Sequence, residues 1–349
     1  MPDKIADNKY EGLNINSSMN VAKCIAIISV IMAHSRNTDY YFYSNVTERI
    51  GAIGVITFLI IAGYYFNVEK YGVKSFFKNK ITSIVVPWVF TGTILFLIGH
   101  NFNFQDWMKW IVGHETYLYY LSMLMLCYLF LSFFNKKTYL VLFVLLNLAS
   151  LLATSFGVFD YLFFKYFKVV EINNYLNVFN WIGFFSIGIL LKNNLKNIMV
   201  FLKRNIIIIT ATYILSLIIG FYLEPAYAGY FSKLAIPLEL LGVIFIFSLS
   251  TITWLNNKFV HNIAELTFAI YLTHFLTFPI RKFLIHTPIM EFINPFIFLG
   301  FNCALLLIGR SFSEKINLEN WYCLLLGIRI DKVKKNIKKL NYNNSPSHG

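Results

Sequence analysis

Lys23 and His34 begin and end one apolar run, Lys23-Cys-Ile-Ala-Ile-Ile-Ser-Val-Ile-Met-Ala-His34, and their types suit anion binding and acid–base chemistry. Eleven helical steps of about 100° bring both residues onto one face of a helix, roughly 16 Å apart along its axis. A neutral imidazole near pH 7 can accept a proton from a hydroxyl and return it, while an ammonium group can hold an anionic donor. In the alternative interpretation, Lys23 only extends from the helix start to the interface and His34 is an interfacial histidine.

Three further polar residues lie inside apolar runs, where ionisable groups are costly and mark candidate sites. Tyr271 and His274 are three residues apart, so they share a helix face and could form a hydrogen-bonding wall of a substrate cavity. The alternative is a polar contact between packed helices. Glu239 follows Pro237 and could face a water-filled outer cavity, or form a structural ion pair with a nearby cation.

A lysine-rich stretch at 67–82 includes Lys78 and Lys80, with aromatic residues between its lysines. This pattern fits a cationic mouth for a phosphate-bearing donor, in which lysine acts as a point charge. It fits equally a helix that lies in the membrane interface. No CxxC, HExxH or paired Cys/His spacing is present, so the sequence predicts no metal site.

The composition predicts a membrane protein. The chain is 57% hydrophobic and 13% charged, whereas soluble domains are roughly 45–50% apolar and about 25% charged. The 36 Phe and 22 Tyr residues fit lipid-facing helices and interfacial aromatic belts. The net charge of +13 does not indicate nucleic-acid binding, because the basic residues fall between apolar runs rather than on one patch.

We expect an all-α integral membrane protein with a bundle of about ten transmembrane helices, since spanning helices need about 17–25 apolar residues. The predicted spans lie near 17–35, 49–66, 84–100, 116–134, 138–156, 178–192, 204–223, 233–253, 263–283 and 291–311. Residues 1–311 would form the membrane domain, and residues 312–349 a basic, partly disordered cytoplasmic tail. The first span lacks a small-x-small cleavage site and is expected to stay in the mature protein.

Lys and Arg divide unevenly between alternate loops of this topology. One set of loops, together with the tail, holds more than twice as many of them as the other set. Because cytoplasmic loops carry the excess of positive charge, both termini are predicted to be cytoplasmic. An even number of spans agrees with that prediction, and it puts Lys23 near the inner face and His34 near the outer face.

The motifs resemble, in order and spacing, the membrane-bound acyltransferase-3 family. The run from Lys23 to His34 is similar to the family's first-helix pattern, although the basic residue there is typically arginine and lysine cannot make a bidentate contact. Gly54-Val-Ile-Thr-Phe-Leu-Ile-Ile-Ala-Gly-Tyr64 is similar to Gly-Val-x-x-Phe-Phe-x-x-Ser-Gly-Tyr/Phe, with departures at Leu59 and Ala62.

Three more segments carry the same resemblance. Phe76-Phe-Lys-Asn-Lys-Ile-Thr-Ser-Ile-Val-Val-Pro87 resembles the family's basic stretch before a proline, but Lys78 and Lys80 stand where the family has Arg-x-x-Arg. Leu118-Tyr-Tyr-Leu121 looks like Leu-Trp-Phe-Leu, and Phe268-Ala-Ile-Tyr-Leu-Thr-His274 looks like Phe-x-x-Tyr-Leu-x-His.

The resemblance implies transfer of an acetyl or other short acyl group from acyl-CoA to a sugar hydroxyl of a surface polysaccharide or lipid-linked glycan. It implies a multi-pass protein of the bacterial cytoplasmic (inner) membrane, with acyl-CoA as a co-substrate and no permanently bound cofactor. His34 would be catalytic, and Lys23, Lys78 and Lys80 would bind the donor. We expect the substrate cavity to be lined by Tyr119, Tyr120, Glu239, Tyr271 and His274.

A transporter or flippase for a polysaccharide or lipid-linked sugar is the main competing hypothesis. A polar stripe within ten helices would also suit a conduit. Transporters of this kind are often built from inverted repeats with interrupted helices, and the sequence contains no such pair. A transporter also needs no acyl donor, so the two hypotheses differ in a measurable way.

Overall fold

The computed structural model describes residues 14–35, 41–167, 173–225, 229–283, 287 and 289–329. These residues form helices and connecting loops, with no strand among them. The first half of the described chain contains α2 (Ile15–His34), α3 (Tyr41–Tyr64), α4 (Val68–Tyr71), α5 (Val73–Lys80), a π-helical segment η1 (Ile81–Val85), α6 (Val86–Gly99), α7 (Phe104–Val112), α8 (Tyr119–Phe133), α9 (Lys137–Ser155) and α10 (Val158–Phe167).

The second half contains four short 3₁₀ segments and a longer one between the α-helices. In chain order these are η2 (Asn174–Leu176), η3 (Val178–Asn180), α11 (Ile182–Leu191), α12 (Leu195–Arg204), α13 (Ile206–Leu223), η4 (Gly229–Phe231), α14 (Ala235–Leu249), η5 (Thr253–Leu255), α15 (Lys258–Thr273), η6 (His274–Phe283), α16 (Met290–Lys315) and α17 (Glu319–Leu326).

Seven described helical stretches are long and apolar enough to cross a membrane: Ile15–His34, Asn45–Tyr64, Val73–Gly99, Lys137–Ser155, Ile206–Leu223, Lys258–Ile280 and Phe292–Lys315. Three shorter apolar helices, α8, α11 and α14, complete the set. Each of the ten ranges predicted from the sequence overlaps one of these helices. The chain is therefore an all-helical protein with multi-pass membrane character, while the number of spans and the orientation stay predictions.

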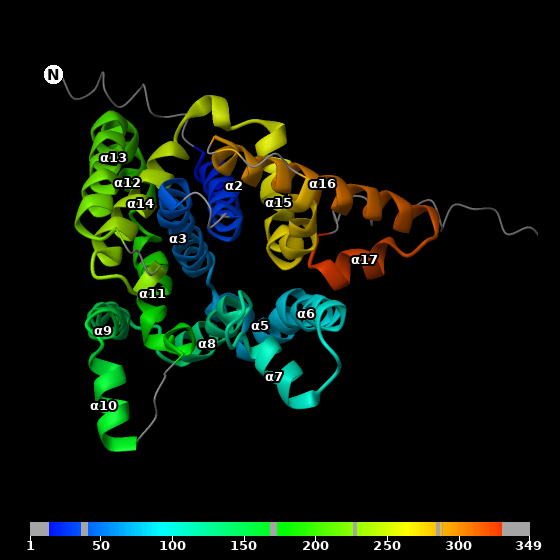
Figure 1. The fold of residues 1–349 in the computed structure, drawn as a ribbon, viewed down its shortest axis with the longest axis horizontal. Helices are drawn as coiled ribbons and strands as arrows, with labels where there is room; N and C mark the ends of the chain where they lie inside the picture. The colour runs from blue at the N-terminus through cyan, green and yellow to red at the C-terminus, as the bar shows by residue number, and fades with distance from the viewer. Residues whose placement is uncertain are drawn as a thin grey trace, which may run out of the picture.

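Helix α2 occupies the centre of the fold, between α3 and α15 (Figure 1). Its N-cap Asn14 accepts a hydrogen bond from the backbone of Ser17 at 3.2 Å. It ends at His34, where the backbone N–H of Ser35 donates to the carbonyl of Ile31 at 2.9 Å. Because α2 is surrounded by helices, Lys23 and His34 on its polar face both contact other parts of the protein.

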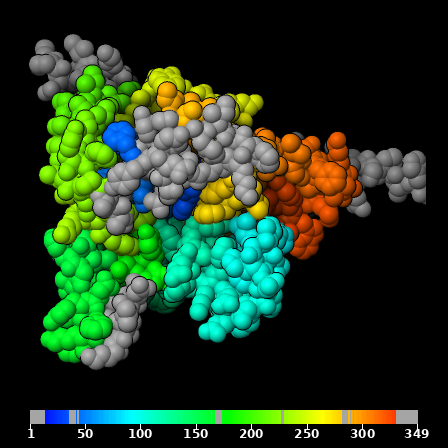
Figure 2. Space-filling model, viewed as in Figure 1, coloured from blue at the N-terminus to red at the C-terminus, as the bar shows by residue number. Residues whose placement is uncertain are grey.

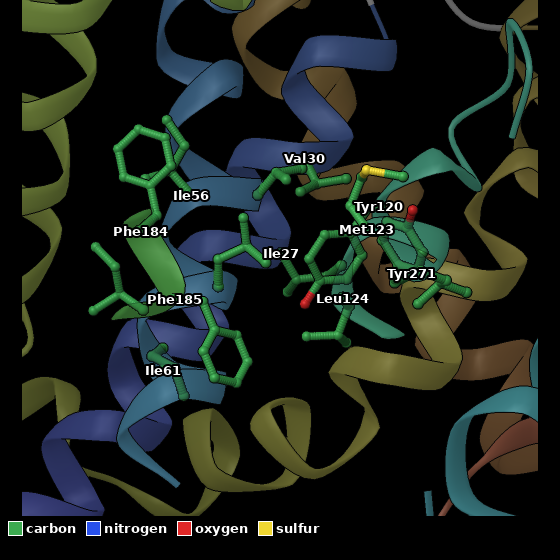
Figure 3. Close-up of a cluster of buried hydrophobic side chains, with 14 of the residues drawn as sticks. Ile27, Val30, Ile56, Ile61, Tyr120, Met123, Leu124, Phe184, Phe185 and Tyr271 are labelled. Atoms are coloured by element: carbon green, nitrogen blue, oxygen red, sulfur yellow. The ribbon is translucent and has the colours of Figure 1, made fainter. Parts of the chain in front are cut away.

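Glycines allow α3 to pack closely on two neighbours. A Cβ on Gly51 would come 2.4 Å from that of Ala33 in α2, and one on Gly63 would come 2.0 Å from the Phe185 carbonyl of α11. Because apolar helices in lipid associate through close packing rather than through a hydrophobic drive, these contacts fix the helix positions. Figure 3 shows the result, a core in which Ile27 and Val30 face aromatic and aliphatic side chains of α3, α8 and α11.

Outside this core, two groups of helices form separate lobes in the space-filling view, α6 with α7 and α9 with α10 (Figure 2). The helices α5 and α6 form one continuous stretch through η1. Pro87 has no N–H to give to the carbonyl four residues earlier, and the wider π turn just before it absorbs this irregularity.

The boundary predicted at residue 311 falls inside α16, which continues to Lys315. The following residues fold back as α17, whose Cys323 is fully buried against α6. Gly327 ends α17 at φ +67° and lies so close to Phe268 and Pro87 that a Cβ would contact the Phe268 ring at 2.5 Å. The first part of the segment predicted as a tail is thus folded, up to residue 329.

Candidate active site

A cavity of about 280 Å³ opens at the end of α2 where His34 lies. Its wall comes from α2, α3, the loop between α7 and α8, the start of α8, the end of α15, and the short segments η2 and η4. The residues that line it are Val30, Ala33, His34, Glu48, Gly51, Ala52, Val55, Gly113, Glu115, Thr116, Tyr117, Tyr119, Tyr175, Gly229, Tyr230 and Tyr271. One imidazole, two carboxylates and five phenols therefore meet in one space.

The loop before α8 is fixed tightly enough to serve as one wall of this cavity. Gly113 has φ +91°, and a Cβ there would come 2.0 Å from the backbone nitrogen of Tyr119, so the turn requires glycine. Trp88 donates from its indole to the carbonyl of Ile111 at 3.0 Å. Thr116 donates to the carbonyl of Trp110 at 3.2 Å. These bonds position Tyr117 and Tyr119.

His34 packs against rings from η6 and from the loop before α8. Its ring centroid lies 5.4 Å from that of His274, 5.1 Å from that of Phe275 and 6.5 Å from that of Tyr117. His274 is fully buried, and its Nδ1 lies 2.7 Å from the carbonyl oxygen of Tyr271. The catalytic candidate of the sequence analysis is therefore beside the second predicted histidine.

Two hydrogen bonds in opposite directions join Tyr117 to the end of α15. The Tyr117 hydroxyl donates to the carbonyl of Leu272 at 2.8 Å, and the Tyr271 hydroxyl donates to the carbonyl of Tyr117. The Tyr117 hydroxyl is a phenol, which is neutral near pH 7 and therefore remains a donor. The wall beside His34 is thus rigid on both sides.

A second wall consists of aromatic rings. Tyr119 lies 4.8 Å from Tyr175 and 5.4 Å from Trp181, measured between ring centroids, and Trp181 lies 5.1 Å from Tyr230. The Trp181 indole donates to the carbonyl of Tyr175 at 3.0 Å, which secures η2 against α11. Such rings present flat apolar faces together with hydroxyl groups. A ring-shaped polar ligand with apolar C–H faces would fit this wall.

Of the five predicted cavity residues, the structure brings Tyr119 and Tyr271 to the cavity surface. Tyr120 lies behind Tyr271, with ring centroids 5.3 Å apart, and Figure 3 shows the pair in the core. His274 lies behind His34. Glu239 is 1% exposed on α14, and its carboxyl oxygens have no hydrogen-bond partner among the described residues.

Toward the opposite end of α2, cations from three parts of the chain lie near one another. Lys23 donates to Asn20 at 3.2 Å, with its ammonium group 5.1 Å from the Tyr65 ring centroid. Lys80 donates to the Tyr128 hydroxyl at 3.2 Å. The charge of Arg329 acts on both lysines and on both tyrosines. The third predicted donor residue, Lys78, is exposed on α5 and is not part of this group.

Several of these residues were not predicted from the sequence. Glu115, Tyr175 and Tyr230 come from a loop and short 3₁₀ segments, where periodicity carries no information about a shared cavity. Glu48 lies on α3, outside the motifs that the sequence analysis singled out. Arg329 falls in the segment predicted as a tail, and its place depends on the packing of α17. Among the described residues, no group of three or more His, Cys, Asp or Glu side chains could hold a metal ion.

A sequence model of a protein family, described as an acyltransferase domain, matches residues 16–309, which is most of the chain. The chain belongs to the acyltransferase 3 family. No curated protein and no solved structure matched the chain. As an acyltransferase 3 family member with several apolar helices, the protein is a multi-pass membrane acyltransferase, and Lys23 and His34 both lie within the matched residues.

Proposed function

We propose that this acyltransferase moves an acetyl or other short acyl group from acyl-CoA to a sugar hydroxyl of a surface polysaccharide or lipid-linked glycan precursor. The observation that carries the proposal is the pairing of two unlike sites on α2. Lys23 lies near two other basic residues, Lys80 and Arg329. His34 lies about 16 Å further along the helix axis, in a tyrosine-rich cavity. The protein would act in the bacterial cytoplasmic membrane, with Lys23 at the inner face.

The donor half of the proposal rests on charge. The phosphate groups of CoA are anionic, and Lys23, Lys80 and Arg329 would share them as charge-assisted partners. The exposed ring of Tyr65, beside Lys23, offers an apolar surface to the adenine base. A CoA molecule held there would extend its pantetheine arm along α2 toward His34, which would bring the thioester to the opposite end of the helix.

The acceptor half rests on the aromatic wall. Tyr119, Tyr175 and Tyr230 would stack on the C–H faces of a sugar ring, and the carboxylates of Glu48 and Glu115 would accept hydrogen bonds from its hydroxyls. These groups make the cavity a better fit for a carbohydrate than for an apolar acceptor.

In the proposed reaction, His34 takes the proton of the acceptor hydroxyl while its oxygen attacks the thioester carbonyl. The carbon–sulfur bond breaks, and the CoA thiolate leaves and receives the proton. Because fixed rings line the cavity beside His34, the hydroxyl and His34 are held in proximity, which supplies part of the rate enhancement.

The test is acyl transfer in isolated membranes with radiolabelled acetyl-CoA and extracted cell-envelope glycans. Wild type and His34→Ala are compared at matched expression. We expect base-labile label on the glycan with the wild type and its loss in the variant. If several acyl-CoA donors give no label with the wild type, and loss of the protein instead stops saccharide from crossing the membrane, the transporter hypothesis replaces this one.

A further inference from the structure

The ring of His274 lies beside the imidazole of His34, and one of its nitrogens, Nε2, has no hydrogen-bond partner among the described residues. Its Nδ1 lies 2.7 Å from the Tyr271 carbonyl oxygen, which can only accept, so Nδ1 carries the proton. The Nε2 of the neutral ring is then an acceptor, and it is buried with no partner among the described residues. Leaving a buried acceptor unmet costs free energy, so a donor that could reach it would be held there.

His34 is the donor that fits. An N–H···N bond of about 2.9 Å between two imidazoles places their ring centroids about 5 Å apart, and the two centroids here are 5.4 Å apart with a tilt of 36°. A small rotation of the His34 ring would therefore complete the bond. Of the other rings beside His274, Phe275 and Phe278 have no donor, and the Tyr117 hydroxyl is already bonded to Leu272.

We propose that His274 positions His34 by accepting its N–H, which leaves the other nitrogen of His34 unprotonated on the cavity side. The inference rests on the proposed acyl transfer. The chain of bonds has a fixed direction, because it starts at the Tyr271 carbonyl: that oxygen accepts from Nδ1 of His274, and Nε2 of His274 accepts from His34. The orienting group of a nucleophile–base–orienter arrangement has this role.

The positioned imidazole can then complete the reaction with all bonds accounted for. The acceptor O–H bond breaks and its proton goes to the unprotonated nitrogen of His34. The new ester C–O bond forms as the thioester C–S bond breaks, and the electron pair leaves with the CoA sulfur. The thiolate takes the proton from His34, which returns to its starting tautomer while its other N–H stays bonded to His274.

The fold holds His274 firmly enough for this role. The residue lies where α15 gives way to η6, and Thr277 donates to its carbonyl at 2.6 Å. Its ring packs on Phe275 at 4.6 Å and on Phe278 at 5.6 Å between centroids. The ring is also closed off from the cavity, because His274 is fully buried and does not line it. His274 would therefore act through His34 rather than on substrate.

Two substitutions test the role of the Nε2 acceptor of His274 separately from the role of the rest of its side chain. His274→Asn keeps a donor near the position of Nδ1 and has no group at the position of Nε2, whereas His274→Gln can present its amide oxygen there. Phe278→Leu is the matched control, since it disturbs packing on the same ring and removes no hydrogen-bonding group. Initial rates are measured in isolated membranes with radiolabelled acetyl-CoA and cell-envelope glycans.

We expect His274→Asn to lower kcat by about 10²-fold, with the KM for acetyl-CoA within about twofold of wild type. His274→Gln should recover about tenfold of that loss, and the control should stay within about threefold. In a His34→Ala background, His274→Asn should change the residual rate less than about twofold, because a group that acts through His34 has nothing left to position. Equal losses in both backgrounds would show that His274 only packs.

The ring tautomers give a readout that does not depend on activity. In protein labelled with ¹⁵N-histidine, wild-type His34 should show one protonated and one unprotonated nitrogen, and His274→Asn should mix the two tautomers. A His34 spectrum that is unchanged by His274→Asn would overturn the pairing. A fixed tautomer in a protein that acylates no glycan would leave the pairing intact and refute the proposed function instead.

Discussion

The two ends of α2 differ in how their polar groups are held. At the His34 end, side chains bond to backbone carbonyls of a rigid loop and helix end, as Tyr117 and Tyr271 do. At the Lys23 end, polar side chains bond to one another, and the contributing residues come from α2, α5 and the segment after α17. Backbone groups fix a geometry, while long side chains adapt to a ligand. The first arrangement suits chemistry, and the second suits the binding of a flexible, charged donor.

The largest expected effect tests this division directly. His34→Gln should lower kcat by about 10³-fold or more, within the range for loss of a general base, while the KM for acetyl-CoA changes little. Lys23→Gln, the comparison variant at the other end of the same helix face, should mainly raise that KM. Initial rates over a range of acetyl-CoA concentrations separate the two. If both variants change only KM, the His34 end and the Lys23 end do not have separate roles in catalysis and donor binding.

Packing at the His34 end gives the second prediction. Gly51→Val would place a side chain where even a Cβ comes 2.4 Å from Ala33, so α3 would move away from α2. Overpacking of this kind costs about 1–3 kcal/mol, and we expect a lower melting temperature together with at least a tenfold loss of transfer.

Gly99→Val is the control, because a Cβ there meets nothing within 4 Å. A thermal unfolding assay in detergent and the membrane transfer assay should both leave this control near wild type. Equal effects of the two substitutions would mean that the contact between α2 and α3 does not determine the shape of the cavity.

The donor end should respond to charge and salt. Lys80→Gln and Arg329→Gln are each expected to raise the KM for acetyl-CoA about three- to tenfold, because each removes one charge-assisted partner of the phosphates. Raising the ionic strength should weaken wild-type donor binding by screening the same charges. Lys78→Gln, an exposed lysine on the same helix as Lys80, should have the smaller effect. An Arg329→Gln variant that binds donor normally would remove Arg329 from the site.

The sequence was informative where a pattern repeats along one helix. The spacing of Lys23 and His34 fixes their common face, and apolar runs predicted the seven long apolar helices and the three shorter ones among the described residues. Tyr271 and His274, three residues apart at the end of α15 and the start of η6, were also predicted as a group. Tyr271 lines the cavity, and His274 instead packs against His34. Local periodicity therefore recovers the helices and their polar faces.

What the sequence could not provide is the set of contacts between distant segments. Tyr175 and Tyr230 lie on short 3₁₀ segments more than 50 residues apart, and their rings are 6.1 Å apart between centroids. No periodic signal joins such positions, because their meeting depends on how α11, α13 and α14 pack. The same holds for Arg329, which reaches the lysines because Gly327 lets the chain pass close to Phe268.

The smallest expected effect concerns the aromatic wall, which lines the cavity on the His34 side. Tyr175→Leu keeps an apolar side chain and loses the ring that lies 4.8 Å from Tyr119. An aromatic contact contributes about 0.5–1.5 kcal/mol, so the KM for the glycan acceptor should rise about two- to tenfold while the KM for acetyl-CoA stays unchanged. Tyr222→Leu, at an exposed position on α13, is the control. A change in the KM for acetyl-CoA instead would mean that the donor, rather than the sugar, occupies this wall.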